Sequence, residues 1–146
     1  MIILMINVKT LFILAVVCII AVSCARMFSN RGTTGDNRML TSYSNVNVEE
    51  FQTMIADPNV QLLDVRTPEE FDDGHIAGAT LIDVNDSTFV ERAVATLDKQ
   101  RPVAVYCRSG RRSGRAANLL SAQGYTVTNL NGGVMAWQDA GKTLIK

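Results

Sequence analysis

Short apolar runs alternate with segments of helical periodicity along residues 46–146, and this alternation limits the folds that the chain can adopt. Four runs are typical of buried strands, because they are short and rich in apolar and β-branched side chains: residues 60–65, 79–84, 101–107 and 125–130. Apolar spacing, with Asn47 as one cap and another cap near Asp86 or Ser87, predicts helices over residues 47–57, 68–73, 87–98, 111–124 and 132–141. Strands separated by helices form a parallel sheet covered on both faces, so we expect an α/β domain.

The N-terminus has the pattern of an export signal. Residues 11–22 (LFILAVVCIIAV) carry no charge and follow Lys9, and the run has the length of a signal-peptide core, short for a spanning helix. It ends in AVSC, which resembles the lipobox of bacterial lipoproteins and implies cleavage before Cys24 and lipidation of Cys24. An uncleaved signal anchor is the alternative, and a start at Met5 instead of Met1 stays open. Either anchor places the domain outside the cytoplasmic membrane.

These features divide the chain into a leader, a linker and one domain. Residues 1–23 are the expected signal peptide, residues 24–45 are polar and typical of a flexible tether, and residues 46–146 form the domain. We expect a monomer that a lipid on Cys24 holds to a bacterial membrane, with the domain in the periplasm or another extracytoplasmic space. The formal net charge is zero and no basic stripe with interleaved aromatics occurs, so nucleic acid is not an expected partner.

Cysteine usage singles out Cys107. Cys18 lies in the leader and Cys24 is the expected lipidation site, so the folded part keeps one cysteine. In an oxidising compartment structural cysteines come in pairs, and a lone cysteine is more often a working thiol than an inert core residue. His75 is the only histidine, and one histidine with one thiol does not make a zinc ligand set. We expect neither a metal nor another cofactor.

The residues around Cys107 form a predicted anion cradle. Residues 107–110 follow a strand and precede a helix, so they lie at the carboxyl edge of the sheet, where open α/β sheets bind ligands. Backbone N–H groups at a helix start have no partner within the helix and bind anions. Arg108, Arg111 and Arg112 add positive charge. Such surroundings stabilise a thiolate, with cysteine pKa values down to about 3.5–7.5, and a persulfide anion fits the same cradle.

Three motifs resemble those of the rhodanese-like sulfurtransferases. They are LLDVRTPEEFDDGHIAGA at residues 62–79, CRSGRRS at residues 107–113 and NLNGGVMAW at residues 129–137, in the order of that family. The resemblance implies an α/β rhodanese-like domain with a central parallel five-stranded sheet and helices on both faces. It also implies a two-step reaction in which a cysteine takes a sulfane sulfur from a donor as a persulfide and passes it to a nucleophile.

By match to the family, Cys107 is the nucleophile. The resemblance implies that its loop binds the donor through amides and positive charge, and that Ser113 donates a hydrogen bond to the sulfur. The expected substrate-binding residues are Arg108, Ser109, Gly110, Arg111, Arg112 and Ser113.

Loop length separates this chemistry from related ones. Phosphatases of a related fold use a C-x5-R loop, whereas Arg112 is the fifth residue after Cys107 and Ser113 is the sixth. The shorter loop favours sulfur over phosphate or arsenate. We therefore expect a sulfurtransferase with a small anionic donor such as thiosulfate and with a thiol or cyanide as acceptor, a thioredoxin-like reductase being one candidate partner. The alternative is a non-catalytic rhodanese module that binds a partner or senses persulfide.

Asp64 and Arg66 stand at the end of a predicted strand, on the same edge of the sheet as the loop. We expect them to support the site, with Arg66 paired to Glu70 and Asp64 bound to loop amides or to an arginine. The alternative is that Arg66 steers anions. His75 and Trp137 are expected to be structural.

Overall fold

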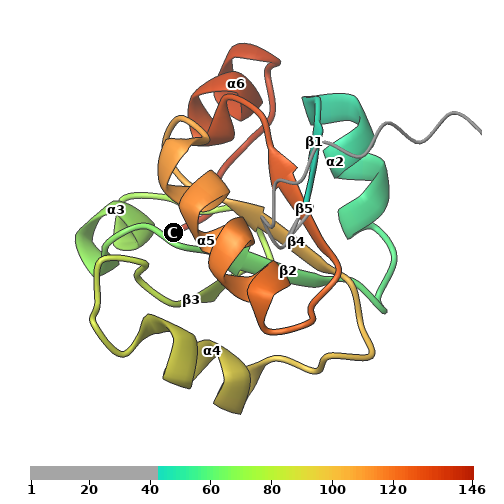
Figure 1. The fold of residues 1–146 in the computed structure, drawn as a ribbon. Helices are drawn as coiled ribbons and strands as arrows, with labels where there is room; N and C mark the ends of the chain where they lie inside the picture. The colour runs from blue at the N-terminus through green and yellow to red at the C-terminus, as the bar shows by residue number, and fades with distance from the viewer. Residues whose placement is uncertain (1–42) are drawn as a thin grey trace, which may run out of the picture. The chain divides into compact units, whose positions relative to one another are not determined.

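The computed structural model describes residues 43–146, which form a five-stranded parallel sheet in the order β1-β5-β4-β2-β3 (Figure 1). The predicted signal peptide, Cys24 and most of the predicted tether lie outside the described residues. No helix in the described part is long and apolar enough to span a bilayer. The elements are β1 (Ser44–Val46), α2 (Val48–Ile55), β2 (Gln61–Asp64), α3 (Pro68–Asp72), β3 (Thr80–Leu81), α4 (Phe89–Thr96), β4 (Val103–Tyr106), α5 (Arg111–Ala122), β5 (Val127–Leu130) and α6 (Gly133–Asp139).

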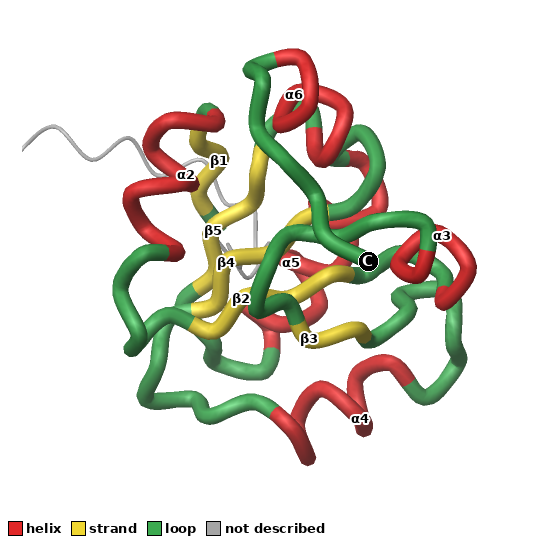
Figure 2. Tube along the Cα trace, turned by 180° about the vertical axis from the view of Figure 1, so that it is seen from behind, coloured by secondary structure: helices red, strands yellow, loops and turns green. Residues whose placement is uncertain are grey.

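Strand β4 lies at the centre of the sheet, between β2 and β5. In the register, Asp64 pairs with Tyr106, and Val105 pairs with Asn129. From β2 the chain moves outward to β3, whereas from β4 it moves to β5 on the other side (Figure 2). The connections therefore diverge at the carboxyl ends of β2 and β4, which is the kind of switch point where open α/β sheets bind ligands.

Alternating side chains of the strands enter two apolar cores, one on each face of the sheet. On β4, Val103 and Val105 belong to one core, and Ala104 and Tyr106 belong to the other. Helices α4 and α5 contribute to the first core, and α2 and α6 contribute to the second. Because β4 is buried on both faces, its sequence is a continuous apolar run. The predicted α/β sheet with helices on both faces is confirmed.

Strand β1 is an edge strand that the sequence pattern did not predict. It runs parallel to β5 and adds side-chain bonds between polar residues. The hydroxyl oxygens of Ser44 and Thr128 lie 3.0 Å apart, and Nδ2 of Asn129 donates to Oδ1 of Asn45 at 2.7 Å. The sheet thus begins inside the stretch expected to be a tether, residues 24–45. An edge strand with exposed side chains needs no apolar run, so its sequence resembles a linker.

The predicted helices form, with differences at their ends. Asn47 caps α2 as expected, and its side chain forms a reciprocal capping box with Glu50. The cap of α4, expected near Asp86 or Ser87, is the next residue, Thr88, and it makes no side-chain cap bond. Asp86 instead accepts the Thr88 N–H at 2.9 Å, in a turn before the helix.

Candidate active site

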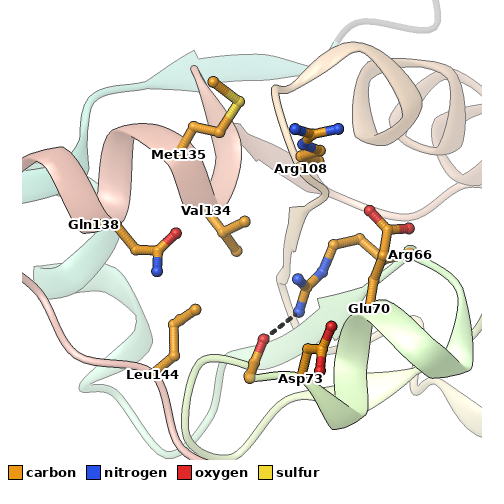
Figure 3. A pocket seen from close by; sticks show the side chains of 9 residues that line it. Arg66, Glu70, Asp73, Arg108, Val134, Met135, Gln138 and Leu144 are labelled. Carbon is orange, nitrogen blue, oxygen red and sulfur yellow. Dashed lines mark hydrogen bonds between the residues drawn. The ribbon is translucent and has the colours of Figure 1, made fainter.

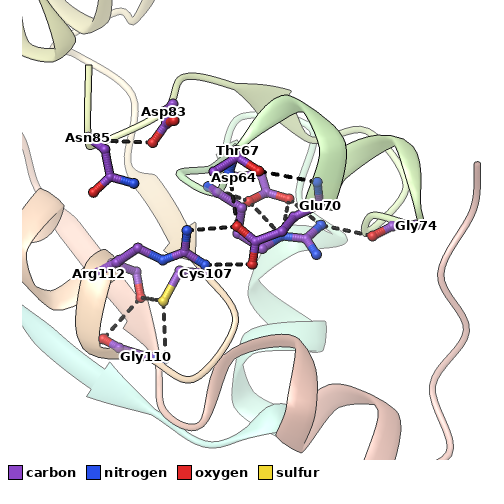
Figure 4. A network of polar contacts seen from close by, with 11 residues as sticks. Asp64, Thr67, Glu70, Gly74, Asp83, Asn85, Cys107, Gly110 and Arg112 are labelled. Carbon is purple, nitrogen blue, oxygen red and sulfur yellow. Dashed lines mark hydrogen bonds and ion pairs between the residues drawn. The ribbon is translucent and has the colours of Figure 1, made fainter.

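The end of β4 brings Cys107 to the switch point. Cys107 is 1% exposed, and its Sγ accepts hydrogen bonds from the N–H of Gly110 at 3.2 Å and from the hydroxyl of Ser113 at 3.3 Å (Figure 4). Gly110 has a φ of 91°, a left-handed conformation that favours glycine, and it lets the loop turn into α5. The sulfur therefore faces donors from the loop and the first turn of α5, as the sequence predicts.

The pKa of the Cys107 thiol lies below its ordinary value. Burial is the largest single influence and raises the pKa, because a buried thiolate loses hydration. Hydrogen bonds from the Ser113 hydroxyl and from the backbone of Ser113, Ser109 and Gly110 favour the thiolate and together outweigh burial. The loop therefore stabilises the nucleophilic form of the cysteine.

The three arginines of the loop are not equivalent. Arg108 and Arg111 are exposed, whereas Arg112 is half-buried and binds Glu70 with both ends of its guanidinium, at 2.7 and 2.6 Å. Hydrogen bonds from Arg112 hold the pKa of Glu70 at about 2, against the opposing effect of burial. The expected ion pair of Arg66 with Glu70 is therefore wrong, because the carboxylate of α3 binds the loop arginine instead.

Asp64 and Arg66 form a buried ion pair beside the loop. Arg66 donates to the Asp64 carboxylate from Nε at 2.9 Å and from Nη2 at 2.6 Å, and Nη2 also donates to the carbonyl of Gly74 at 2.8 Å. The guanidinium lies 5.6 Å from the centre of the Tyr106 ring. Asp64 thus pairs with an arginine, as expected. The charge of Arg66 is already compensated, which disfavours a role in steering anions.

The contacts of His75 and Trp137 are structural. The His75 ring stacks on Phe71 with centroids 3.7 Å apart, and its Nδ1 lies 3.0 Å from the carbonyl oxygen of Phe71. Trp137 is buried in the core under α2 and α6, and its Nε1 donates to the carbonyl of Thr143 at 3.1 Å. The expected core position of Trp137 is confirmed, and the contacts of His75 agree with the structural role expected for it.

The start of α6 holds the back of the cysteine loop, a contact that sequence reasoning missed. The N–H of Val134 donates to the carbonyl of Cys107 at 2.9 Å, and the N–H of Met135 donates to the carbonyl of Arg108 at 3.1 Å. Gly133 has a φ of 59°, and a Cβ there would come within 2.6 Å of the Arg108 carbonyl. The sequence signal that could have indicated this contact is the Gly-Gly pair of the third motif, residues 132 and 133. With these carbonyls fixed, the loop N–H groups point toward the sulfur.

A cavity of about 310 Å³ lies beside the loop (Figure 3). Arg108, which follows Cys107, forms part of its wall, and so does Glu70, the partner of Arg112. The lining residues are Arg66, Glu70, Asp73, Gly74, Arg108, Val134, Met135, Gln138 and Leu144. The wall therefore joins the end of α3, the cysteine loop and one side of α6.

Comparison with known proteins gives the family. The model of the rhodanese-like domain matches residues 47–140. The chain belongs to the rhodanese-like domain family. The rhodanese-like match extends from α2 through α6 and contains every residue of the cysteine loop. Strand β1 precedes the matched region but completes the rhodanese-like sheet by pairing with β5.

Two relatives named as sulfurtransferases are covered almost whole. A protein named Sulfurtransferase from Allochromatium vinosum is 35% identical over 102 residues, which are 68% of this chain and 92% of that protein. Thiosulfate sulfurtransferase GlpE from Shewanella oneidensis is 35% identical over 103 residues, which are 69% of this chain and 98% of that protein. The solution structure of the rhodanese-like domain of the Alr3790 protein from Anabaena sp. has a TM-score of 0.63 and 30% identity, and covers 71% of this chain and 80% of that one.

Proposed function

We propose that this protein is a sulfurtransferase that carries a sulfane sulfur as a persulfide on Cys107. The observation that carries the proposal is the Cys107 sulfur, which accepts bonds from Gly110 N–H and the Ser113 hydroxyl at the start of a helix. The same donors that favour a thiolate also favour the anionic outer sulfur of a persulfide. Family membership and relatives named as sulfurtransferases support the same chemistry.

The reaction has two balanced steps. The Cys107 thiolate attacks the outer sulfur of a small anionic donor such as thiosulfate, the donor S–S bond breaks, and sulfite leaves with the electron pair. A thiolate or cyanide then attacks the outer sulfur of the persulfide, and the electron pair of that S–S bond returns to Cys107. Because the sulfur enters and leaves as an electrophile, neither step needs a cofactor.

Phosphate or arsenate chemistry is less well supported than sulfur transfer. Arg112, the last arginine of the loop, is held by Glu70 and does not offer its full charge to a tetrahedral anion. A non-catalytic rhodanese module also fits poorly, because the loop keeps both the cysteine and its hydrogen-bond donors.

Intact mass after exposure to thiosulfate tests the proposal. In a Cys18→Ser, Cys24→Ser variant, Cys107 should gain one sulfur, about 32 Da, that a reducing thiol removes, since thiolates open such bonds. The same protein with Cys107→Ser should gain none. Cleavage of an aryl phosphate that depends on Cys107, without any gain of sulfur from thiosulfate or polysulfide, would establish the phosphatase alternative instead.

The place of the protein in the cell is a second part of this proposal. The AVSC ending of the apolar run supports cleavage before Cys24, lipidation, and a domain tethered in the cell envelope. We further expect this domain to be a monomer. A thioredoxin-like reductase of the same compartment would then be a suitable thiol acceptor. Mass spectrometry of membrane-extracted protein should find an acylated Cys24 terminus, and Cys24→Ser should release or mislocalise the protein. A terminus at Met1 or Met5 would replace the lipid by a signal anchor.

A further inference from the structure

The charge of Arg112 is compensated inside the protein before any donor arrives. Its guanidinium binds the Glu70 carboxylate through Nη1 at 2.7 Å and through Nη2 at 2.6 Å, and its side chain is 24% exposed. The hydrogen bonds to Glu70 raise the pKa of Arg112 against the opposing effect of burial. The thiolate of Cys107 and the carboxylate of Asp83 raise it further, which places both close to Arg112. Three negative groups thus share this one positive charge.

Glu70 is held so that its negative charge stays beside the cysteine loop (Figure 4). Its Oε2 also accepts the N–H of Thr67 at 3.2 Å, in the capping box of α3. Its pKa is about 2, chiefly because Arg112 donates to it, so the carboxylate is ionised at every pH near neutrality. The Glu70 side chain is 30% exposed and lines the cavity beside the loop together with Arg108. An anion that approaches the loop therefore meets this carboxylate.

The other positive charges of the loop lie on the surface. Arg108 and Arg111 are exposed and make no ion pair within residues 43–146. Solvent and salt screen charges of this kind, so each of them stabilises an anion weakly. The groups that contact the Cys107 sulfur, the N–H of Gly110 and the hydroxyl of Ser113, are neutral. The loop therefore has little positive charge to offset a highly charged donor.

The charge that gathers at the loop depends on the donor. Attack of the Cys107 thiolate on thiosulfate brings three negative charges together, because the donor carries two. Methanethiosulfonate, in which a methyl group replaces one oxygen of thiosulfate, carries one charge and brings only two together. Both reactions balance in the same way: the thiolate bonds to the outer sulfur, the donor S–S bond breaks, and sulfite or methanesulfinate leaves with the electron pair. The additional charge of thiosulfate is repelled by Glu70.

We propose that Glu70 is a specificity-determining residue, which favours sulfane-sulfur donors with one negative charge over doubly charged donors such as thiosulfate. The inference rests on the proposed function, because it names the charge class of the first substrate of Cys107. Glu70 acts through Arg112, since it cancels the positive charge that would otherwise bind the second negative charge of the donor. Thiosulfate is then a donor that the loop accepts but disfavours.

Two donors of similar shape and different charge test the inference on the full chain with Cys18→Ser and Cys24→Ser. The rate of persulfide formation on Cys107 is measured by intact mass, once with thiosulfate and once with sodium methanethiosulfonate. The result is expressed as the thiosulfate rate divided by the methanethiosulfonate rate in the same variant. Intrinsic donor reactivity is the same for every variant, and a general effect on the loop changes both rates, so neither alters the comparison of this ratio between variants.

Glu70→Gln should raise this ratio about threefold to fivefold, the effect of one partly exposed charge on the additional charge of thiosulfate. If the bond to Arg112 only braces the loop, both rates should change together and the ratio should stay constant. Glu69→Gln is the matched control, because it removes the same charge from an exposed position of the same helix that neither binds an arginine within residues 43–146 nor lines the cavity. The ratio of this control should equal that of the parent.

A double variant tests whether Glu70 acts through Arg112. Adding Arg112→Gln to Glu70→Gln removes the positive charge that the first substitution releases, and the pair is again neutral. The ratio should then fall back to about that of the parent. A ratio that stays raised in the double variant would contradict the role assigned to Arg112 and overturn the inference.

The outcomes separate this inference from the proposed function. If neither donor forms a persulfide on Cys107, both the proposed function and the selection of donors by Glu70 are overturned. If both donors form the persulfide but the ratio in Glu70→Gln equals that of the parent, or rises equally in Glu69→Gln, only the selection by Glu70 is overturned.

Discussion

The reactivity of Cys107 depends on a small number of donors, and one of them is a side-chain hydroxyl that a single substitution removes. Ser113 is fully buried and its hydroxyl donates to Sγ at 3.3 Å. Ser113→Ala removes a bond that favours the thiolate and leaves burial unchanged, so it should raise the pKa of Cys107. The midpoint of alkylation rate against pH, in protein with Cys18→Ser and Cys24→Ser, should move to higher pH.

A second serine of the same helix provides the control for this experiment. Ser121 also lies in α5, and its buried hydroxyl is without a hydrogen-bond partner among residues 43–146. Ser121→Ala should leave the alkylation midpoint of Cys107 in place. If the parent and Ser113→Ala have the same alkylation midpoint, the Ser113 hydroxyl does not lower the pKa of Cys107, and the backbone N–H groups alone do so.

At the level of single residues, the sequence predicted which groups surround the Cys107 sulfur. It did not predict which arginine is neutralised by Glu70. The strand-loop-helix pattern placed Cys107 beside the amides of α5, because that junction is a local feature of the chain. The pairing of Arg112 with Glu70 joins residues 42 positions apart, and its choice over Arg66 depends on distances between separate elements. Local sequence pattern does not contain such distances.

At the level of elements, the cysteine loop and α6 form one unit through Gly133. An alanine there would need a left-handed φ, which costs about 1–2 kcal/mol, and its Cβ would also meet the carbonyls of Cys107 and Arg108. We expect Gly133→Ala to lower the free energy of unfolding by about 3–5 kcal/mol and to reduce the yield of persulfide. Urea unfolding and intact mass after thiosulfate measure the two effects.

A substitution at Gly141 separates the cost of the left-handed backbone from the cost of the close contact with the loop. It has a φ of 74°, but a Cβ there would have no atom within 4 Å, so Gly141→Ala carries the backbone cost alone, about 1–2 kcal/mol. If Gly133→Ala and Gly141→Ala lower the free energy of unfolding by similar amounts, the close contact between α6 and the loop adds nothing to the cost of Gly133→Ala.

The Glu70–Arg112 pair joins α3 to the cysteine loop and should respond to pH. Glu70 has a pKa of about 2 in the folded protein, below the value of about 4.3 expected in an unfolded chain. A lowered folded-state pKa adds stability that is fully present above about pH 4.3 and is lost as the pH falls toward 2. Glu70→Gln should therefore lower the free energy of unfolding by about 1–2 kcal/mol near neutral pH, and by progressively less in acid.

In Glu70→Gln, glutamine can still accept the capping hydrogen bond of α3, so the substitution removes only the negative charge of Glu70. Glu70 forms the capping box of α3 with Thr67, and Glu50 holds the same position in α2 without an arginine partner in residues 43–146. Urea unfolding of Glu70→Gln and of the control Glu50→Gln should be compared from about pH 7 to about pH 3. A Glu70→Gln effect that does not shrink in acid would contradict the assigned pKa.

At the level of the whole molecule, the alternation of strands and helices was enough to predict the architecture. Buried strands such as β4 have continuous apolar sequences because both faces are covered, and the helices have recognisable apolar spacing and caps. Strand β1 carries neither signal. It lies at the sheet edge with polar side chains, and only its pairing with β5 distinguishes it from the linker before it.

The contribution of β1 can be measured with two shortened chains, residues 43–146 and residues 47–146. The shorter chain lacks the three residues that pair with β5 and also Tyr43, which packs against the core under α4 and α5. Backbone bonds contribute about 0.5–1.5 kcal/mol each, so the shorter chain should be less stable by about 2 kcal/mol or more, with a lower urea midpoint. Because β5 lies between β1 and β4, the strand that leads into Cys107, persulfide formation on Cys107 below the transition should persist in both. If the two chains unfold at the same urea concentration, residues 43–46 add no stability, and they belong to the linker, with the domain starting at α2.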